Sequence, residues 1–462
     1  MHKNEKNIFL LLWFLILISI NSYAIDFISS HKLDFNLNLK NIYFIVELIR
    51  FNIPFFVFIY LACIFLFIKK KIDQFSFFFF IYAIWQLIIG NILNKEGIKI
   101  NDYQITISLI CVLLIFYLSY IKNYGDLYIK FLYIFIIFIS CIGFYFTFNI
   151  YNEFISRPDL YYFYVTKTLS IEDSSFGQPN PRITGLARIL VIIFYFIFYY
   201  ILLKKIKISY KIFLFCSLFF LNLSIYASQT RMGFMGIFII LFFYIFFIKE
   251  NLFKKYLMVV LIFILPIISF ELLIKIKNFS LSKESNTLFF ESQNSFESQN
   301  SFKSQNRNFN INAGTSGRTT IWSTSLKIVY EKKLIFGNGP QSDRILLGEY
   351  YKNSPFSNRN DLKYGSNSSN AIIYSILCGG VVSLFFLLQI YYLISTKLVN
   401  SVLRIKKKPK NFLNYFLITC LCFLIFRSIF ENSFALFGVD FCLLCLCYYI
   451  LNIKKLSFNK SI

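Results

Sequence analysis

Apolar runs recur along almost the whole chain, and short segments that are rich in lysine separate them. A run of about 20 apolar residues is long enough to cross the hydrocarbon core of a bilayer as a helix. We predict twelve such spans, at residues 8–25, 42–68, 75–93, 104–121, 131–149, 185–203, 212–229, 232–248, 257–275, 370–396, 411–429 and 434–452. The pattern therefore predicts an all-α polytopic membrane protein.

The first run could be a secretory signal peptide instead of a span. Lys3 and Lys6 precede it, and Asn21-Ser22-Tyr23-Ala24 is a fair cleavage site. A run of this length can also cross a bilayer, and we favour an uncleaved first helix.

The lysines give the orientation of the spans. They concentrate in alternate connections, as the positive-inside rule predicts for cytoplasmic loops: 69–71, 122–130, 204–207, 249–255, 404–408 and 454–455. The connections near 26–41 and 94–103 hold few basic residues. We therefore expect both termini in the cytoplasm. The net charge of +24 follows from this topology, so nucleic acid is not an expected partner.

Two segments predicted to lie outside the membrane are long, at about 150–184 and 276–369. The second divides the chain into a region of nine spans (1–275), an extracytoplasmic loop (276–369) and a region of three spans (370–462). Within the loop, the hexapeptide Phe290-Glu-Ser-Gln-Asn-Ser295 repeats over 296–301 and in part over 302–306. A low-complexity polar repeat cannot bury a core, so we interpret 290–306 as a flexible insertion.

The loop changes character after the repeat. Residues 319–330 have helical periodicity, with Ile321, Trp322, Leu326 and Val329 expected on one face. Gly337-Asn-Gly-Pro340 then marks a turn. We expect this half of the loop to form short amphipathic helices on the outer membrane surface.

Composition supports a membrane protein and excludes several chemistries. The chain is 57% hydrophobic and only 15% charged. Its ten cysteines all fall within predicted spans, where free thiols behave as small apolar groups, so neither zinc nor disulfides are expected. The chain has two histidines, His2 and His31, and lacks a phosphate-binding glycine loop, a DxD motif and an HExxH motif. We expect no metal and no cofactor.

Arginines near the predicted outer surface are the strongest candidates for chemistry. Arg231 lies in a very short hairpin between two spans, and Arg318 lies where the external loop meets its first helix. Arg182 and Arg188 flank the entry to the span at 185–203. A guanidinium group is always charged and binds phosphate through two parallel hydrogen bonds, so these side chains suit a phosphorylated lipid. Each could also extend toward lipid head groups without any catalytic role.

Three further charged residues have structural interpretations. Arg427 and Glu431 are four residues apart at the end of the eleventh span, so they could pair on one helix face and stabilise the helix. Asp440, in the last span, could bond a neighbouring helix, and Arg188 calls for an anion or a carboxylate partner.

These motifs together resemble the bacterial O-antigen ligase/polymerase family. The matching elements are Arg231 in a short outer hairpin, Ser316-Gly317-Arg318-x-x-x-Trp322 in a large external loop, and Asn370 followed by Gly380. The resemblance is best between residues 180 and 385. In ligases of the family a histidine precedes the asparagine, and Ser369 occupies that position here.

The resemblance implies an enzyme that transfers a glycan from undecaprenyl pyrophosphate on the outer leaflet of the bacterial inner membrane. Arg231 and Arg318 would be catalytic, neutralising charge on the leaving pyrophosphate. Arg182, Arg188, Trp322, Ser369 and Asn370 would bind substrate. Polymerases of the family tolerate loss of the histidine, so a repeat-unit polymerase is favoured over a ligase, with a chain-length regulator as a candidate partner.

Other assignments remain open from the sequence. A flippase for lipid-linked oligosaccharides also has about twelve spans, but two similar halves and a deep row of cations would be expected, and neither is present. A structural or adhesin-like membrane protein is a weaker alternative. The general base is not identified, although Glu172, Asp173, Asp343, Glu349 and Asp361 are external carboxylates.

Overall fold

The structure is a computed structural model. It describes residues 2–20, 39–67, 72–93, 100–156, 183–228, 230–269, 271–272, 318–352, 367–407 and 411–453. Every regular element in these ranges is helical, which agrees with the all-α prediction. Eight described helices are long and apolar enough to cross a membrane, and three shorter apolar helices accompany them. A total of twelve spans stays a prediction.

The helices follow the predicted spans in order. The first group is α1 (His2–Ile18), α2 (Leu39–Leu66), α3 (Gln74–Leu93), α4 (Ile100–Ile121), α5 (Gly125–Ser156), α7 (Ile183–Leu203), α8 (Ile208–Ala227), α9 (Arg231–Phe247), α10 (Leu252–Val259) and the π-helical turn η3 (Val260–Ile264). The second group is α12 (Arg318–Glu331), α13 (Ser342–Lys352), α14 (Ala371–Lys407), α15 (Phe412–Phe430), the 3₁₀ turn η6 (Ser433–Ala435) and α16 (Val439–Asn452). The hexapeptide repeat lies outside the described residues.

Several helices begin or end at other residues than the apolar runs that predicted them. α5 was expected over 131–149 and α14 over 370–396, but both continue into polar sequence. α1 was expected over 8–25 and instead begins at His2 and ends at Ile18. Hydropathy marks the part of a helix that suits lipid, whereas backbone hydrogen bonding decides where the helix ends.

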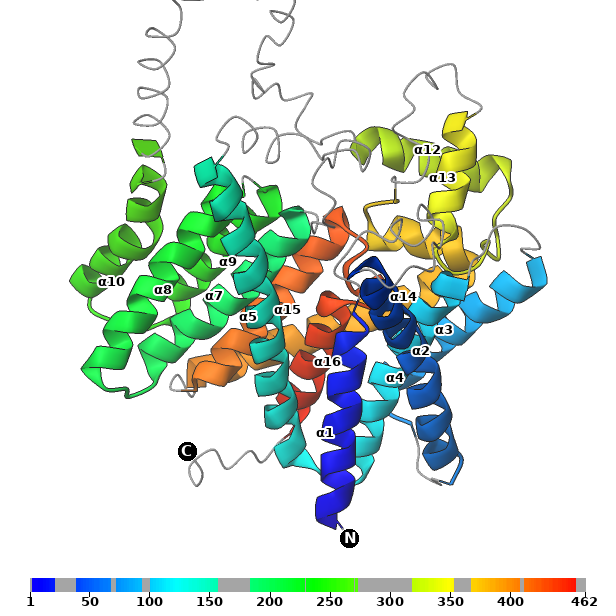
Figure 1. Ribbon diagram of the computed structural model, residues 1–462, viewed down its shortest axis with the longest axis horizontal. Coiled ribbons are helices and arrows are strands. Elements are labelled where there is room, and N and C mark those ends of the chain that lie inside the picture. Colours follow the sequence, from blue (N-terminus) through cyan, green and yellow to red (C-terminus); the bar gives the residue numbers. More distant parts are fainter. Residues whose placement is uncertain are drawn as a thin grey trace, which may run out of the picture.

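The helices form one bundle, with α12 and α13 packed over one end of it (Figure 1). We call this the loop end of the bundle. α14 packs against α3 and α15, and α15 packs in turn against α7 and α9. α4, α5 and α16 join through stacked aromatic rings, such as Tyr128 and Tyr449 with centroids 5.8 Å apart. The chain start and the lysine-bearing connections after α4, α7 and α9 lie at the opposite end (Figure 1).

α12 confirms the helix predicted over 319–330 but corrects its buried face. Ile328 is buried, with Ile321, Trp322 and Val329 packed around it, whereas Leu326 is 53% exposed. The reason is the helical period, because residues i, i+4 and i+7 from Ile321 share a face and Leu326 falls outside this series. This face holds α12 against α13 and α14.

α14 is broken at Gly380, and a segment between α12 and α13 closes the break. Gly380 has φ 64° and ψ −155°, so the helical hydrogen bonds stop there. Residues 335–339, which we call the strap, supply replacements. Val381 N donates to Ile335 O (2.9 Å), Asn338 N donates to Leu377 O (3.0 Å), and Gly339 N donates to Cys378 O (2.8 Å).

The strap and α14 approach so closely that only glycine fits at the contact. A Cβ atom on Gly380 would lie 2.0 Å from Ile335 O, and one on Gly337 would lie 2.4 Å from Gly379 N. Trp85 Nε1 of α3 donates to Gly379 O (2.9 Å). Irregular backbone within a membrane protein is tolerated when its polar groups are satisfied in this way. The turn predicted at 337–340 is therefore a docking element for a broken helix.

Candidate active site

Three arginines and two carboxylates meet at the loop end of the bundle. They are Arg188 of α7, Arg318 of α12, Arg427 of α15, Glu431 just after α15, and Asp440 of α16. We call these five residues the charge cluster. It carries one unit of excess positive charge, which suits an anionic ligand.

Asp440 is the buried centre of the cluster. Its Oδ2 accepts hydrogen bonds from Arg427 Nε (2.7 Å) and Ser433 Oγ (3.0 Å), and its Oδ1 lies 3.3 Å from Arg188 Nη1. The Asp440 side chain is only 1% exposed. A buried carboxylate is stable only when paired and hydrogen-bonded, and here it ties α7, α15 and α16 together. The expected carboxylate partner of Arg188 and the expected interhelical role of Asp440 are both confirmed.

Glu431 does not pair with Arg427 as the sequence spacing predicted. α15 ends at Phe430, and Glu431 has an extended backbone with φ −148°, so the i, i+4 geometry of a helix is lost. Instead Glu431 Oε1 lies 2.8 Å from Arg318 Nη2, and both side chains are 17% exposed. The predicted catalytic Arg318 is therefore held by a carboxylate from a distant part of the chain.

Trp322 lies one turn after Arg318 and also contacts the end of α15. Its ring centroid is 6.3 Å from that of Phe430. The indole Nε1 is buried and has no hydrogen-bond acceptor among the described residues. Arg188 Nε and Arg427 Nη1 are also buried and have no hydrogen-bond acceptor among the described residues. These three buried donors lie within the charge cluster or beside it.

Arg231 is the first residue of α9 and is exposed. α9 packs against α7, where Gly236 lies against Val191 and its carbonyl accepts a 2.6 Å hydrogen bond from Tyr195 Oη. Both helices start at the loop end. Arg188 precedes this contact by about 4.5 Å and Arg231 by about 7.5 Å at 1.5 Å per residue, so they lie at similar heights on neighbouring helices. Arg231 therefore lies at the same end of the bundle as the charge cluster.

Ser369 and Asn370 begin α14. Asn370 Oδ1 accepts from the amides of Ile372 (2.8 Å) and Ile373 (3.1 Å), and its Nδ2 donates to Ile429 O (2.8 Å). The side chain thus caps α14 and ties it to α15. Ser369 has φ 46°, a left-handed conformation in which histidine and asparagine occur more readily than most residues. Its Oγ donates to Asn367 Oδ1 (2.7 Å).

A buried network of hydrogen bonds, which we call the polar knot, joins Asp343, Ser368, Asn370 and Asn432. Asp343 of α13 accepts hydrogen bonds at Oδ2 from Ser368 N (2.9 Å) and Ser368 Oγ (3.0 Å). Asn432 Oδ1 accepts in turn from Asn370 N (3.0 Å). Burial raises the pKa of the Asp343 carboxyl above its ordinary value. The knot fixes the end of α15 against α13 and the start of α14.

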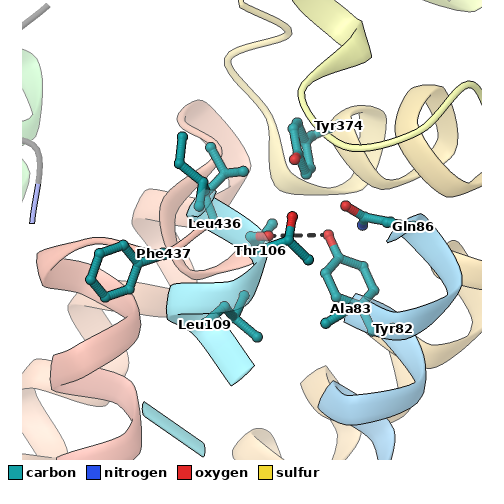
Figure 2. A pocket seen from close by; sticks show the side chains of 10 residues that line it. Tyr82, Ala83, Gln86, Thr106, Leu109, Tyr374, Leu436 and Phe437 are labelled. Carbon is teal, nitrogen blue, oxygen red and sulfur yellow. Dashed lines mark hydrogen bonds between the residues drawn. The ribbon is translucent and has the colours of Figure 1, made fainter. Parts of the chain in front are cut away.

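A small polar pocket opens between α3, α4, α14 and the segment after η6. The hydroxyls of Tyr82, Thr106 and Tyr374 and the amide of Gln86 converge on it (Figure 2). It has room for about one water molecule. Gln86 Nε2 is buried and has no partner among the described residues. A water bound there would satisfy it.

Comparison with known proteins identifies the region that contains much of this site. Residues 212–388 match the family model described as O-antigen ligase. The match confirms the resemblance to the O-antigen ligase/polymerase family. Members of this family are glycosyltransferase-like enzymes that act on lipid-linked glycans. No curated protein and no solved structure matches the chain.

The matched region of this O-antigen ligase family covers part of the charge cluster only. Of the cluster, the matched region includes Arg318. It also includes the other predicted site residues Arg231, Trp322, Ser369 and Asn370. Three helices outside the match add the rest of the cluster, which is Arg188, Arg427, Glu431 and Asp440. The fold therefore completes the site with residues from both sides of the family segment.

Some predicted positions cannot be compared with the geometry. Arg182, Gly317, Glu172, Asp173 and Asp361 lie outside the described residues. Among the candidate bases that are described, Glu349 is exposed and paired with Lys332 at 2.7 Å, and Asp343 is enclosed in the polar knot.

Sequence reasoning missed the contribution of α3 and of the segment after α15. Gln86 and Trp85 stand within an apolar span, and such polar side chains are a recognised sign of an interior contact. Glu431-Asn432-Ser433 is a short polar segment between two apolar helices, which is typical of an ordered connection. The partners of these residues could not be known before the fold.

Proposed function

We propose that this protein is a polymerase of a surface polysaccharide. It joins oligosaccharide repeat units carried on undecaprenyl pyrophosphate, on the outer leaflet of the bacterial inner membrane, with both termini in the cytoplasm. The observation that carries the proposal is the charge cluster, together with Arg231 at the same end of the bundle, because their excess positive charge matches a membrane-bound pyrophosphate.

The choice of polymerase over ligase rests on Ser369. A ligase of this family is expected to use a histidine at this position, beside the asparagine that caps α14. Serine at a left-handed φ of 46° has no imidazole to offer, and its hydroxyl is bonded to Asn367. The chemistry that the family's ligases assign to this position is therefore missing from this chain.

The proposed reaction is a metal-independent glycosyl transfer. A hydroxyl of one lipid-linked repeat unit attacks the reducing-end anomeric carbon of the growing glycan. A carbon–oxygen bond forms there as the bond to the pyrophosphate oxygen breaks, and the electron pair leaves with the lipid pyrophosphate. Arg231 and Arg318 stabilise that developing charge.

The remaining predicted residues take supporting roles in this proposal. Arg188 and Trp322 present donors to the phosphates, and Arg182, which precedes α7 in the sequence, is proposed to bind substrate as well. Ser369 and Asn370 shape the floor of the site through the start of α14. A chain-length regulator would act as a partner, and the lipid bilayer presents both substrates.

Deletion of the gene distinguishes polymerase, ligase and flippase, with the surface glycan separated on a gel. Loss of a polymerase leaves export and attachment of single units intact, so the long ladder should collapse to one short band. Long polymer stranded on its lipid carrier would instead identify a ligase. Single units trapped on the cytoplasmic leaflet, with nothing at the surface, would identify a flippase.

The arginine roles are tested by conservative substitution. Arg318→Lys and Arg231→Lys should each abolish most polymer while the protein stays in the membrane, because an ammonium group cannot replace the two-pronged guanidinium contact. Arg404→Lys, at an exposed position near the far end of α14, is the matched control and should leave the ladder unchanged. Normal polymer with both lysine variants of the site would remove them from the mechanism.

The orientation is tested with topology reporters. A reporter fused after Ser304 should read extracytoplasmic, and one fused after Lys408 should read cytoplasmic. The opposite pair of signals would put the charge cluster on the wrong side of the membrane for this reaction.

A further inference from the structure

We propose that Glu431 accepts the proton of the attacking sugar hydroxyl, and that the donor pyrophosphate frees it for this task by taking over its partner Arg318. The inference rests on the proposed function and supplies the base that the reaction requires. It starts from the 2.8 Å contact between Arg318 Nη2 and Glu431 Oε1.

Other described carboxylates at the loop end are unsuited to the task. Asp440 is 1% exposed and held by two arginines and Ser433. Asp343 is fully enclosed within the polar knot. Glu331 and Glu349 are exposed and paired with Lys327 and Lys332, and exposed Glu271 accepts a hydrogen bond from Tyr226. Glu431 combines partial exposure with contact to a predicted catalytic arginine.

The backbone on each side of Glu431 is fixed. Its own amide donates to Arg427 O (2.9 Å), which anchors it to the last turn of α15. The next residue, Asn432, is buried and hydrogen-bonded to Ser368 Oγ and to the amide of Asn370. The fixed backbone keeps the Glu431 carboxylate within side-chain reach of the Arg318 site, and a general base needs such a position.

The contact with Arg318 can be exchanged. One guanidinium nitrogen meets one carboxylate oxygen, and both side chains are 17% exposed, so a ligand can reach the pair. A pyrophosphate carries more charge than a carboxylate and can bind both prongs of the guanidinium group. Arg318 is therefore expected to turn to the donor, which leaves the Glu431 carboxylate without this partner beside the reacting sugar.

The exchange links donor binding to base activation. The hydroxyl proton passes to a Glu431 oxygen as the new glycosidic bond forms, and the bond between the anomeric carbon and pyrophosphate breaks. Arg318 holds the negative charge of the leaving group. When the lipid pyrophosphate departs, Glu431 releases the proton to water and recovers Arg318. The acceptor is thus activated only when a donor is bound.

The test separates binding from turnover. Glu431→Gln keeps an oxygen for Arg318 but cannot take a proton. Binding of undecaprenyl pyrophosphate to the purified variant in nanodiscs should be as tight as for the wild type or tighter, because a competing negative charge is gone. The glycan ladder in cells should fall by about 100-fold or more, the usual size of general-base catalysis. Arg318→Lys should lose both readouts.

Two outcomes would overturn the proposal. A normal ladder with Glu431→Gln would show that no proton passes through this residue. Parallel loss of pyrophosphate binding and polymer would show that Glu431 only positions Arg318. Failure of the proposed function itself is recognised separately, because the gene deletion would then give carrier-bound polymer or no surface glycan at all.

A second variant covers the case in which Glu431→Gln does not accumulate. Glu431→Ala leaves a small space at the carboxylate position, and sodium formate added to isolated membranes should restore polymer formation if the missing group is a base. Absence of rescue in membranes that still bind undecaprenyl pyrophosphate would count against the role. Restoration by formate would support it, since a purely structural residue would not respond.

Discussion

Gly380→Ala should release the strap from the broken helix. The added Cβ would lie 2.0 Å from Ile335 O, so this carbonyl must move. Its movement removes the bond from Val381 N and weakens the two neighbouring bonds from Asn338 and Gly339. Alanine at φ 64° and ψ −155° adds strain.

The magnitude follows from these contacts. Net hydrogen-bond contributions of about 1 kcal/mol each, with about 1–3 kcal/mol for the backbone conformation, weaken docking of the strap by about 3–5 kcal/mol. At about 1.4 kcal/mol per factor of ten, the open state becomes about two to three and a half orders of magnitude more populated.

The thiol of Cys378 is a native reporter of this opening. It is fully buried beneath the strap, where its carbonyl binds Gly339 N. A water-soluble maleimide should label Cys378 faster in Gly380→Ala, measured by mass spectrometry of its peptide, with buried Cys445 as an internal reference. Gly438→Ala is the matched control, because nothing lies within 4 Å of its added Cβ. Equal labelling of Cys378 in both variants would refute the reasoning.

Four other outcomes are expected. Asp440→Asn should destabilise the protein by about 3–5 kcal/mol, seen as lower thermal stability in detergent, because buried Arg427 and partly buried Arg188 lose their counter-charge; an unchanged melting temperature would contradict this. Asn370→Ala should cost about 1–2 kcal/mol, whereas Asn370→Asp keeps the cap of α14 and should cost less; the reverse order would exclude a capping role. Since burial raises the pKa of Asp343, its contribution to stability is present below the unfolded-state pKa and is lost as pH rises toward the folded-state pKa, so Asp343→Asn should flatten the pH dependence of thermal stability. Deleting 290–306 should leave protein abundance and polymer length unchanged on immunoblot and glycan gel, and loss of polymer at normal abundance would assign the repeat a role.

The sequence allowed the class of fold and the order of its helices to be predicted, because apolar length and helical period are local properties. It also singled out Arg231, Arg318 and Trp322, which stand out as polar or bulky residues at predicted surfaces. The partner of Arg318 could not be predicted, since Glu431 is more than a hundred positions away and its helix ends one residue before it.

The break in α14 was equally beyond local inference. Gly380 was noted as a family position, but a glycine inside an apolar span is also compatible with an unbroken helix. The role of Gly380 depends on the carbonyl group of Ile335 and the amide group of Asn338. Every residue type except proline carries these same two backbone groups. A contact between backbone groups cannot be predicted from residue types, so the fold was needed to show that Gly380 makes room for the Ile335 carbonyl.

The strap also fixes the length of the part of the loop that contacts α14. Three backbone hydrogen bonds join Ile335, Asn338 and Gly339 to α14, and an insertion among these residues would shift the bonds out of register. The loop can therefore not grow by duplication within the strap, because the strap must stay in register with α14. The sequence shows such a duplication at 290–306, which is outside the strap.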